Sequence, residues 1–348
     1  MAQTHQLQVD GGRLTKRYVS WSRGEHRREW AVLRRVHDRH PDLVPEPLDA
    51  DLDADPPTIA MSLLPGTPLP GGSDTDPQTA PATALDANRR AALHGGLDVD
   101  RRAALDGGPD ADRRAALDGG LDLDRRAALN DGLDAGRRDE ALNGGLGVDR
   151  QAALPGGLDA ARRAALNSGP GVHQQAALSD ALRRLWSTPC GDLPPRRDHP
   201  AELPAVMAER MAGLELPGRA GEAAHAARSF LAGLRLGPAR TTVLGHGDPN
   251  LANYLWDGQR IRIVDFEDAG RSDPEFEMAD LVEHVGARGA DWAGFLARFD
   301  LDGDRLLDAR RLFATFWLHL LRPGGPAERR NPPGSLDRQA ERLLDLLS

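Results

Sequence analysis

The segment from residue 243 to residue 265 constrains the fold more than any other part of the chain. It reads VLGHGDPNLANYLWDGQRIRIVD, in which a short apolar strand leads into the loop HGD. Alternating residues on both sides of Asp257-Gly258 predict a β-hairpin, because Asp-Gly strongly favours a two-residue turn. With that turn, Asn253 would face Arg262 and Asp265 would return to the same open end. The pattern therefore predicts an amide and two carboxylates close together.

This set of side chains matches what phosphoryl transfer requires. Mg²⁺ prefers hard oxygen ligands, which the Asp265 carboxylate and the Asn253 amide can supply. An acceptor hydroxyl must be oriented and must lose its proton, and Asp248 in the loop HGDPNLAN is suited to that task. The order H-x-D-x-x-x-x-N, then a strand, then D-F is that of the catalytic and metal loops of kinases.

The motifs HGDPNLAN and VDFEDAG resemble the signature of the aminoglycoside phosphotransferase family, which comprises kinase-like small-molecule phosphotransferases. The resemblance implies an α+β, protein-kinase-like fold of two lobes. It implies an enzyme that moves the γ-phosphoryl group of Mg²⁺-bound ATP or GTP to an alcohol group of a small molecule, with an aminoglycoside as one candidate. On the same basis Asp248 is the catalytic base, Asn253 and Asp265 bind Mg²⁺, and His246 supports the loop.

Residues 1–69 are predicted to form the amino-terminal lobe and the hinge. Lys16 is the only lysine in a chain with 44 basic side chains, and it lies in a strand pattern at residues 14–19. An amphipathic helix pattern follows at residues 25–37 and includes Glu29. By the family resemblance, Lys16 would bind nucleotide phosphates and Glu29 would be its ion-pair partner.

The apolar strand at residues 58–64 resembles the family's strand and hinge that contact adenine. Backbone groups near Ser62 and Leu64 would make those contacts. Because 15 residues precede Lys16, the chain has room for one hairpin before the lysine strand. The sequence therefore predicts an amino-terminal lobe that is reduced relative to the family.

Residues 70–178 carry a tandem repeat and are predicted to be an insertion. The block RRAAL recurs with a 12-residue period, and the consensus is L-D-x-D-R-R-A-A-L-D/N-G-G. Each unit allows about two helical turns, which is too short for a helix that is stable alone in water. The block contains no Phe, Tyr or Trp. A mobile or weakly helical insertion is therefore favoured over an ordered helical solenoid, which stays open.

Residues 179–348 are predicted to form a mainly helical carboxy-terminal lobe that carries the catalytic and metal loops. Glu277 stands where the family has an aspartate, and no catalytic role is assigned to it. Four acidic residues after the metal loop could hold a polyamine or could be solvated helix faces, and both readings stay open. They are Asp268, Glu275, Asp280 and Glu283.

Composition excludes several classes of function. The net charge of −9 argues against nucleic-acid binding, which needs a basic surface. The chain has no apolar run long enough to span a membrane, and its single cysteine fits a cytoplasmic location. The expected partner is a small hydroxylated substrate, and the oligomeric state is open. The alternative function is a catalytically impaired, kinase-fold binding protein, which the short amino-terminal lobe favours.

Overall fold

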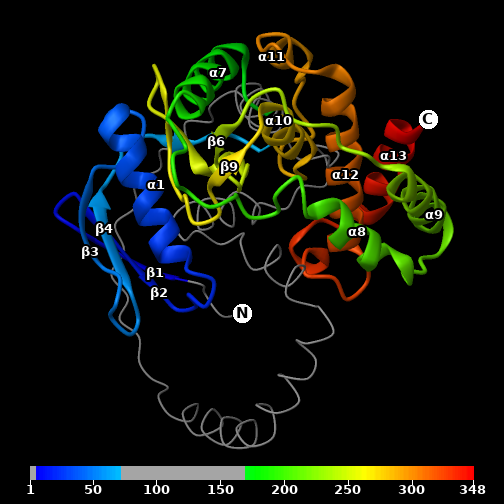
Figure 1. Cartoon of the computed structure of the whole chain (residues 1–348), viewed down its shortest axis with the longest axis horizontal. Coiled ribbons are helices and arrows are strands. Elements are labelled where there is room, and N and C mark those ends of the chain that lie inside the picture. The colour runs from blue at the N-terminus through cyan, green and yellow to red at the C-terminus, as the bar shows by residue number, and fades with distance from the viewer. Residues whose placement is uncertain (1–4, 72–168) are drawn as a thin grey trace, which may run out of the picture.

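An antiparallel sheet at the amino-terminal end packs beside a larger, mainly helical part (Figure 1). The computed structural model describes residues 5–71 and 169–348. Most of the predicted repeat insertion, from residue 72 to residue 168, lies outside the described residues.

The amino-terminal sheet has four strands in the order β1-β2-β4-β3, and every neighbouring pair is antiparallel. A hairpin turn at Gly11 and Gly12 joins the first two strands, and both glycines have positive φ angles of 52° and 85°. This turn confirms the single hairpin expected ahead of the lysine strand. The strands are β1 (His5–Asp10), β2 (Arg13–Tyr18), β3 (Pro47–Asp51) and β4 (Thr58–Ser62).

Helix α1 (Glu25–Arg39) lies against this sheet and confirms the predicted amphipathic pattern. Val32, Leu33 and Val36 are buried toward the core at helical spacing. Glu29 lies on the same buried side, one turn before Leu33. The helical period therefore turns an acidic side chain inward, toward the strand that carries Lys16.

The catalytic segment forms a hairpin whose register differs from the prediction. Strands β7 (Tyr254–Trp256) and β8 (Ile261–Ile263) pair so that Leu255, not Asn253, faces Arg262. The Asp257 carboxylate accepts the N–H groups of Gln259 and Arg260, so the loop holds four residues instead of two. The two-residue shift leaves each side chain on its predicted face and brings Asn253 opposite Val264.

Two small sheets connect the catalytic segment to the rest of the molecule. Strand β5 (Thr67–Pro68) pairs with β7, so the chain leaving the first sheet rests on the hairpin. Strand β6 (Val243–Gly245) pairs with β9 (Gly270–Ser272), which closes the segment at both ends. A short 3-10 helix, η1 (Leu251–Asn253), joins the HGD loop to the hairpin.

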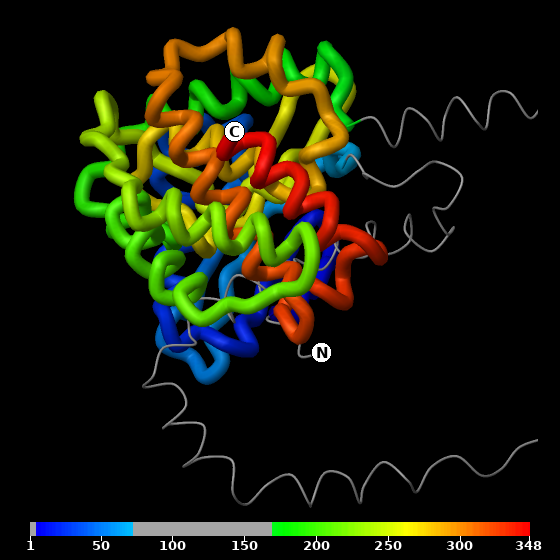
Figure 2. The backbone as a smooth tube through the Cα atoms, turned by 90° about the vertical axis from the view of Figure 1, so that its right-hand side faces the viewer, coloured from blue at the N-terminus to red at the C-terminus, as the bar shows by residue number. Residues whose placement is uncertain are grey.

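The helical part has two cores. One contains α7, the hairpin and the underside of the first sheet, and it includes Tyr18, Leu178 and Phe295. The other holds α8, α9, α12 and α13, which lie side by side near the carboxy terminus (Figure 2). The helices are α7 (Val172–Trp186), α8 (Leu203–Ala212), α9 (Gly218–Gly233), α10 (Pro274–Glu283), α11 (Ala293–Leu296), α12 (Gly303–Leu321) and α13 (Ser335–Leu347), with the 3-10 helix η2 at Glu328–Arg330.

Two further observations concern these helices. Helix α7 begins at Val172, inside the range that the sequence predicts as insertion. Within residues 5–71 and 169–348, no helix combines the length and apolar character that a membrane crossing needs.

Candidate active site

The HGD loop follows strand β6 and has a backbone conformation that needs glycine. Gly247 has a φ of +81°, and a Cβ there would lie 2.2 Å from the carbonyl oxygen of Asp268. The Nε2 atom of His246 lies 2.9 Å from the carbonyl oxygen of Val264, and its Nδ1 accepts the N–H of Asp248. His246 therefore ties the HGD loop to the end of the hairpin, as a supporting residue would.

Asp248 and Asn253 are directly bonded. The Asn253 Nδ2 atom donates to Asp248 Oδ2 at 3.0 Å and to the Asp248 carbonyl oxygen at 3.3 Å. The N–H of Asn250 lies 3.3 Å from the other carboxylate oxygen, and the Asn250 side chain caps η1. Asp248 is 8% exposed. These bonds hold a partly accessible carboxylate in one orientation, which is what a general base requires.

Lys16 is the centre of a second group, which we call the Lys16 cluster: Lys16, Glu29, Asp265 and Glu267. The Nζ atom lies 2.7 Å from Asp265, 2.8 Å from Glu29 and 3.4 Å from Glu267. The Tyr18 hydroxyl also donates to Glu29. The structure thus brings the lysine of β2, the glutamate of α1 and the aspartate after β8 into contact.

Mutual attraction sets the charge states in the Lys16 cluster. Burial alone would lower the pKa of Lys16, but the Asp265, Glu267 and Glu29 carboxylates outweigh it and raise the pKa well above its usual value. Burial would likewise raise the pKa of Asp265, yet the Lys16 ammonium brings it down to about 2. Both groups are therefore charged at neutral pH, and each holds the other in its ionised form.

The backbone at Asp265 is unusual for a residue with a side chain. Its φ angle is +68°, in the left-handed region that non-glycine residues seldom adopt. Such conformations cost about 1–3 kcal/mol and cluster at functional sites. The conformation turns the carboxylate back toward Lys16, since Asp265 would otherwise continue the direction of strand β8.

The oxygen atoms of Asn253 and Asp265 suit Mg²⁺ as ligands. Asn253 uses its Nδ2 atom on Asp248, so its amide oxygen is left for a cation. Lys16 bonds to Oδ1 of Asp265, and no described residue donates to Oδ2. Three carboxylates meet Lys16 here, with the His5 ring beside two of them, and carboxylate oxygens are ligands that Mg²⁺ prefers. Asn253 and Asp265 are accordingly the residues that would hold the ion.

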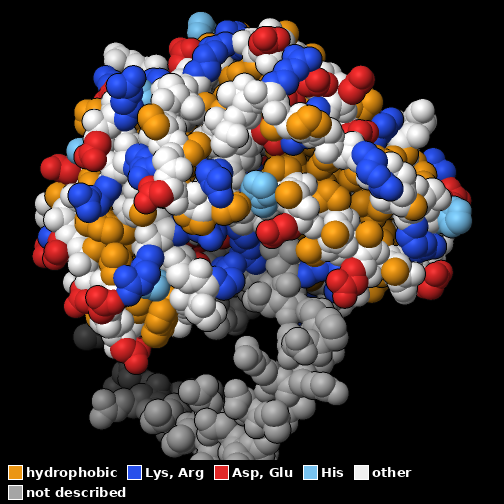
Figure 3. Space-filling model, viewed as in Figure 1, with side chains coloured by type: hydrophobic (Ala, Val, Ile, Leu, Met, Phe, Trp, Pro, Cys, Tyr) orange, Lys and Arg blue, Asp and Glu red, His pale blue; other side chains and the backbone are white. Residues whose placement is uncertain are grey.

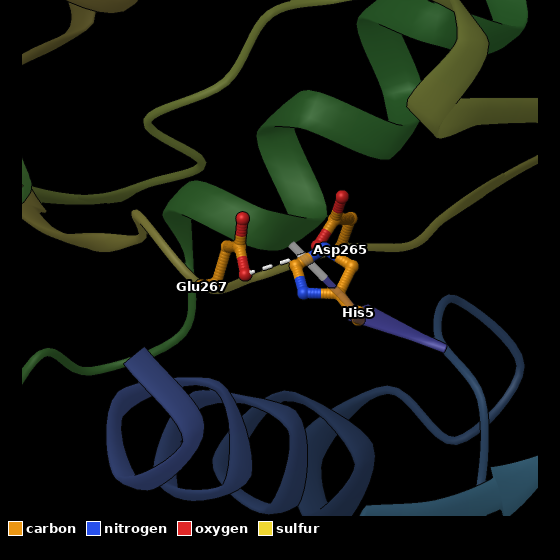
Figure 4. Close-up of side chains that lie close together, drawn as sticks. All are labelled: His5, Asp265 and Glu267. Atoms are coloured by element: carbon orange, nitrogen blue, oxygen red, sulfur yellow. Dashed lines mark ion pairs between the residues drawn. The ribbon is translucent and has the colours of Figure 1, made fainter. Parts of the chain in front are cut away.

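Two further residues beside Asp265 were missed in the sequence. Ligand atoms of His5, Asp265 and Glu267 lie within 4.8 Å of one another, and Figure 4 shows the His5 ring next to both carboxylates. Glu267 lies two positions after Asp265, but the left-handed backbone at Asp265 and the turn at Glu267 break the strand alternation that would have pointed to it. His5 could not have been found, since nothing local links β1 to a residue so far along the chain.

A third group, the Arg196 cluster, consists of Arg196, Glu277 and Asp280 and was also missed. The guanidinium donates to Glu277 at 2.5 Å, to Asp280 at 2.7 Å and to the carbonyl oxygen of Gly247 at 3.2 Å. Glu277 in turn accepts the N–H of His246 at 2.8 Å. The Arg196 cluster therefore fixes both sides of the HGD loop, and Glu277 has the structural role that its sequence position left undefined.

The four acidic residues considered for a polyamine are neither solvated nor directed at a substrate. All four are at most 2% exposed. Asp280 pairs with Arg196, and Glu283 pairs with Arg310 and Arg342. Asp268 lies 3.7 Å from Arg197, and Glu275 accepts the N–H of Asp302. Both sequence interpretations are wrong here, because tertiary packing has matched these carboxylates with arginines and backbone donors.

The two residues predicted at the hinge differ in their backbone bonds. The N–H of Ser62 donates to the Glu46 carbonyl oxygen at 2.9 Å, so it belongs to the sheet. Among the residues that the structure describes, no backbone hydrogen bond involves Leu64. Leu64 is half-buried and lies two residues after the end of β4.

Comparisons with known proteins agree with this geometry. A family model described as "Phosphotransferase enzyme family" matches residues 13–313. A choline/ethanolamine kinase family protein from Mesorhizobium loti superposes with a TM-score of 0.51 at 14% identity, over 100% of this chain and 86% of that chain. Similar solved structures also include the GDP complex of aminoglycoside 2′-phosphotransferase-IIIa (TM-score 0.49, 13% identity, 100% and 90% covered). Choline kinase LicA from Streptococcus pneumoniae is another similar structure (TM-score 0.47, 10% identity, 100% of this chain and 90% of that chain covered).

A comparison with curated protein sequences finds no match to this chain. The likeness to the Mesorhizobium loti protein concerns the fold, which is α+β and kinase-like. The family model covers the Lys16 strand, the HGD loop and Asp265 together. The chain therefore belongs to the phosphotransferase enzyme family, as its catalytic motifs predict.

Proposed function

We propose that this protein transfers the γ-phosphoryl group of Mg²⁺-bound ATP or GTP to a hydroxyl group of a small molecule. The observation that carries the proposal is the meeting of the Asp248–Asn253 pair with the Lys16 cluster. Asn253 accepts the N–H of Val264 at 3.0 Å, and the next residue is Asp265. This arrangement brings together the four groups that the proposal needs: the Asp248 base, the Asn253 amide oxygen, the Asp265 carboxylate and the Lys16 ammonium.

In this proposal Asp248 acts on the acceptor. Its carboxylate orients the hydroxyl group and accepts the proton as the oxygen attacks the γ-phosphorus. The new O–P bond forms as the bond between the γ-phosphorus and the bridging oxygen breaks, and the nucleoside diphosphate leaves with that electron pair. The bonds from Asn253 to Oδ2 and from the Asn250 N–H to Oδ1 hold the carboxylate in place, and each oxygen keeps a lone pair for the acceptor hydroxyl.

Lys16 and Glu29 act on the nucleotide. Lys16 would exchange its bond with Asp265 for a phosphate oxygen, while Glu29 keeps the ammonium in place. Asn253 and Asp265 would hold Mg²⁺, which neutralises charge on the phosphate oxygens as they react. On the face shown in Figure 3, basic side chains lie along the boundary between the sheet and the helical part, where an anionic nucleotide would enter.

The nucleotide base is proposed to lie between two lobes, the sheet part and the helical part. Leu64 suits the hinge because no described residue uses its backbone N–H and C=O groups. Ser62 is less suited through its N–H, which the sheet already uses. A cytoplasmic location, where ATP and GTP are plentiful, belongs to the same proposal.

The acceptor is proposed to be a small molecule with a free hydroxyl group. An aminoglycoside remains a prediction, and the four acidic residues once considered for binding it are paired elsewhere. A panel of acceptors should therefore include choline and neutral alcohols beside aminoglycosides.

Calorimetric titration of ATP and of GTP, with and without Mg²⁺, tests the nucleotide site. We expect Mg²⁺-dependent binding that is weakened in Asp265→Asn. Phosphorus NMR with the acceptor panel then detects transfer, and Asp248→Asn should retain nucleotide binding but lose about 10²–10⁴-fold in rate.

The absence of nucleotide binding in the folded protein would overturn the proposed enzyme. The second candidate, a kinase-fold binding protein, would then be favoured. A kinase-fold binding protein would be expected to bind an acceptor molecule without binding a nucleotide.

A further inference from the structure

A pocket of about 370 Å³ lies in the helical part and shares no residue with the Lys16 cluster or the HGD loop. It is bounded by the loop after α10, by α11, and by the exposed sides of α12 and α13. Its volume falls within the range of small-molecule sites, about 300–1,000 Å³. Its lining is basic: Arg288, Arg310, Arg338 and Arg342 contribute to it.

Glu283 positions three of these arginines, two through its buried carboxylate and one through its backbone carbonyl oxygen. Glu283, at the end of α10, is 0% exposed. Arg310 donates its Nε to Glu283 at 2.8 Å, and Arg342 bonds to both carboxylate oxygens at 2.7 and 3.0 Å. Arg288 donates to the carbonyl oxygen of Glu283 at 3.2 and 3.3 Å. The guanidinium groups are thus held in fixed places around the pocket.

Two of these arginines, Arg310 and Arg338, keep guanidinium nitrogens that no carboxylate among the described residues engages. Arg338 donates to uncharged acceptors, the Pro333 carbonyl oxygen and the Ser335 hydroxyl. Arg310 uses its Nε on Glu283, and among the described residues its two terminal nitrogens bond to no carboxylate. These planar groups have the geometry that binds phosphate oxygens in pairs.

One wall of the pocket is apolar. Trp292 is 7% exposed, and its Nε1 donates to the Ala287 carbonyl oxygen at 2.7 Å, which fixes the indole. Phe295 packs edge-on against the indole from the core side, with ring centroids 5.1 Å apart. Val282 and Leu296 complete this wall. A ligand that filled the pocket would therefore have an apolar body as well as a negative group.

We propose that this pocket binds an organic phosphate monoester. A phosphate monoester carries about −1.5 to −2 charges at neutral pH and three acceptor oxygens, which suits the two guanidinium groups of Arg310 and Arg338. Its oxygens would bond to Arg310 and Arg338, and its apolar body would lie on Trp292. The inference stands independently of the proposed catalytic function, because none of these residues touches the HGD loop or the Lys16 cluster.

Titration calorimetry with phenyl phosphate, in Mg²⁺-free buffer, tests this site. We expect one molecule to bind per chain, and each of Arg310→Gln and Arg338→Gln to weaken binding about tenfold. Arg219→Gln is the matched control, because Arg219 is an exposed arginine on α9 that pairs with Glu222. Inorganic phosphate should bind more weakly than phenyl phosphate, since it makes no contact with Trp292.

Further variants separate this site from the catalytic one. Lys16→Met should leave phenyl phosphate binding unchanged. Loss of binding in Lys16→Met with full binding in both arginine variants would assign the ligand to the Lys16 cluster and overturn the proposal. Absence of binding to the wild-type protein would also overturn it. Arg310→Gln removes a partner of a buried carboxylate and could unfold the chain, so Arg338→Gln, checked by thermal unfolding, keeps the test decisive.

Discussion

The Lys16 cluster and the Arg196 cluster are both buried groups of charges, yet they are built in opposite ways. In the Lys16 cluster one ammonium is shared by three carboxylates at 2.7–3.4 Å. In the Arg196 cluster one guanidinium directs separate nitrogens to two carboxylates and to two backbone carbonyl oxygens. A compact, rotatable charge with surplus partners can change partners, whereas a planar group with dedicated acceptors cannot.

This difference indicates that the Lys16 cluster and the Arg196 cluster have different roles. In the proposed enzyme the Lys16 cluster is the place where Mg²⁺ and the nucleotide phosphates would bind, because several carboxylate oxygens meet a rotatable ammonium there. The Arg196 cluster holds the HGD loop from both sides through Glu277 and Gly247, so it marks the support. Equivalent substitutions in the two clusters should therefore damage different properties.

The largest effect is expected from removing one aspartate charge in each cluster. Asp265→Asn should lower phosphoryl transfer by about 10²–10³-fold, because a metal ligand is lost. It should lower the free energy of unfolding by less than Asp280→Asn does, because Glu29 and Glu267 still pair with Lys16 after the change. Asp280→Asn should lower the free energy of unfolding by about 3 kcal/mol, because a partner of a buried arginine is lost. Steady-state kinetics and urea unfolding measure the two effects, and a reversed pattern would contradict the comparison.

Exchange of the two cations is expected to have the next largest effect. Arg196→Lys should cost about 2 kcal/mol of unfolding free energy, because one ammonium cannot reach four fixed acceptors. Lys16→Arg should instead weaken Mg²⁺-nucleotide binding by about tenfold, because a planar fork does not fit a buried space that holds one nitrogen. Equal losses of stability in both variants would show that the clusters have the same structural role.

Acid should weaken the Lys16 cluster through Asp265. The folded-state pKa of Asp265 is about 2, below the ordinary 3.8 of an aspartate. The pairing with Lys16 therefore stabilises the fold above pH 3.8, and this contribution is lost as the pH falls from 3.8 toward 2. Lys16→Met removes the pairing, so its deficit relative to wild type should shrink as the pH falls. Urea unfolding of both proteins at about pH 6 and about pH 3 measures the deficit.

The smallest effect is expected from Glu267, the most distant partner of Lys16 at 3.4 Å. Glu267→Gln should change the free energy of unfolding by about 1 kcal/mol or less and the nucleotide KM by only a few-fold. Glu29→Gln is the matched variant, because Glu29 lies 2.8 Å from Lys16 and also accepts from Tyr18. A larger loss of unfolding free energy in Glu267→Gln than in Glu29→Gln would show that Glu267, not Glu29, is the stronger partner of Lys16.

The sequence predicted most of the candidate site because its residues lie in locally readable elements. Asp248, Asn253 and Asp265 lie within one loop and one hairpin, and the residues between them give each its place. Lys16 and Glu29 were found by a strand pattern and a helix pattern near the amino terminus. The hairpin register was predicted wrongly, since the Asp257 side chain closes a longer loop than the Asp-Gly pair alone suggests.

The residues that were missed share one property: their partners are far away in the sequence. Arg196 and Glu277 are separated by 81 positions. The four acidic residues after the metal loop were misread for the same reason, because their burial depends on arginines from other helices. A pattern of neighbours cannot say which of the many arginines in this chain will meet a given carboxylate.

The sequence by itself indicated the candidate catalytic and metal-binding side chains, the helix and strands that carry them, and the family to which the chain belongs. Short-range periodicity and turn chemistry suffice for these features, because they depend on residues a few positions apart. Tertiary structure alone decided that Lys16 meets Asp265, 249 positions away, that His5 joins Glu267, and that Glu283 gathers arginines around a pocket. Such contacts arise when apolar faces pack and bring distant charges together, and the charges then select partners by distance and geometry.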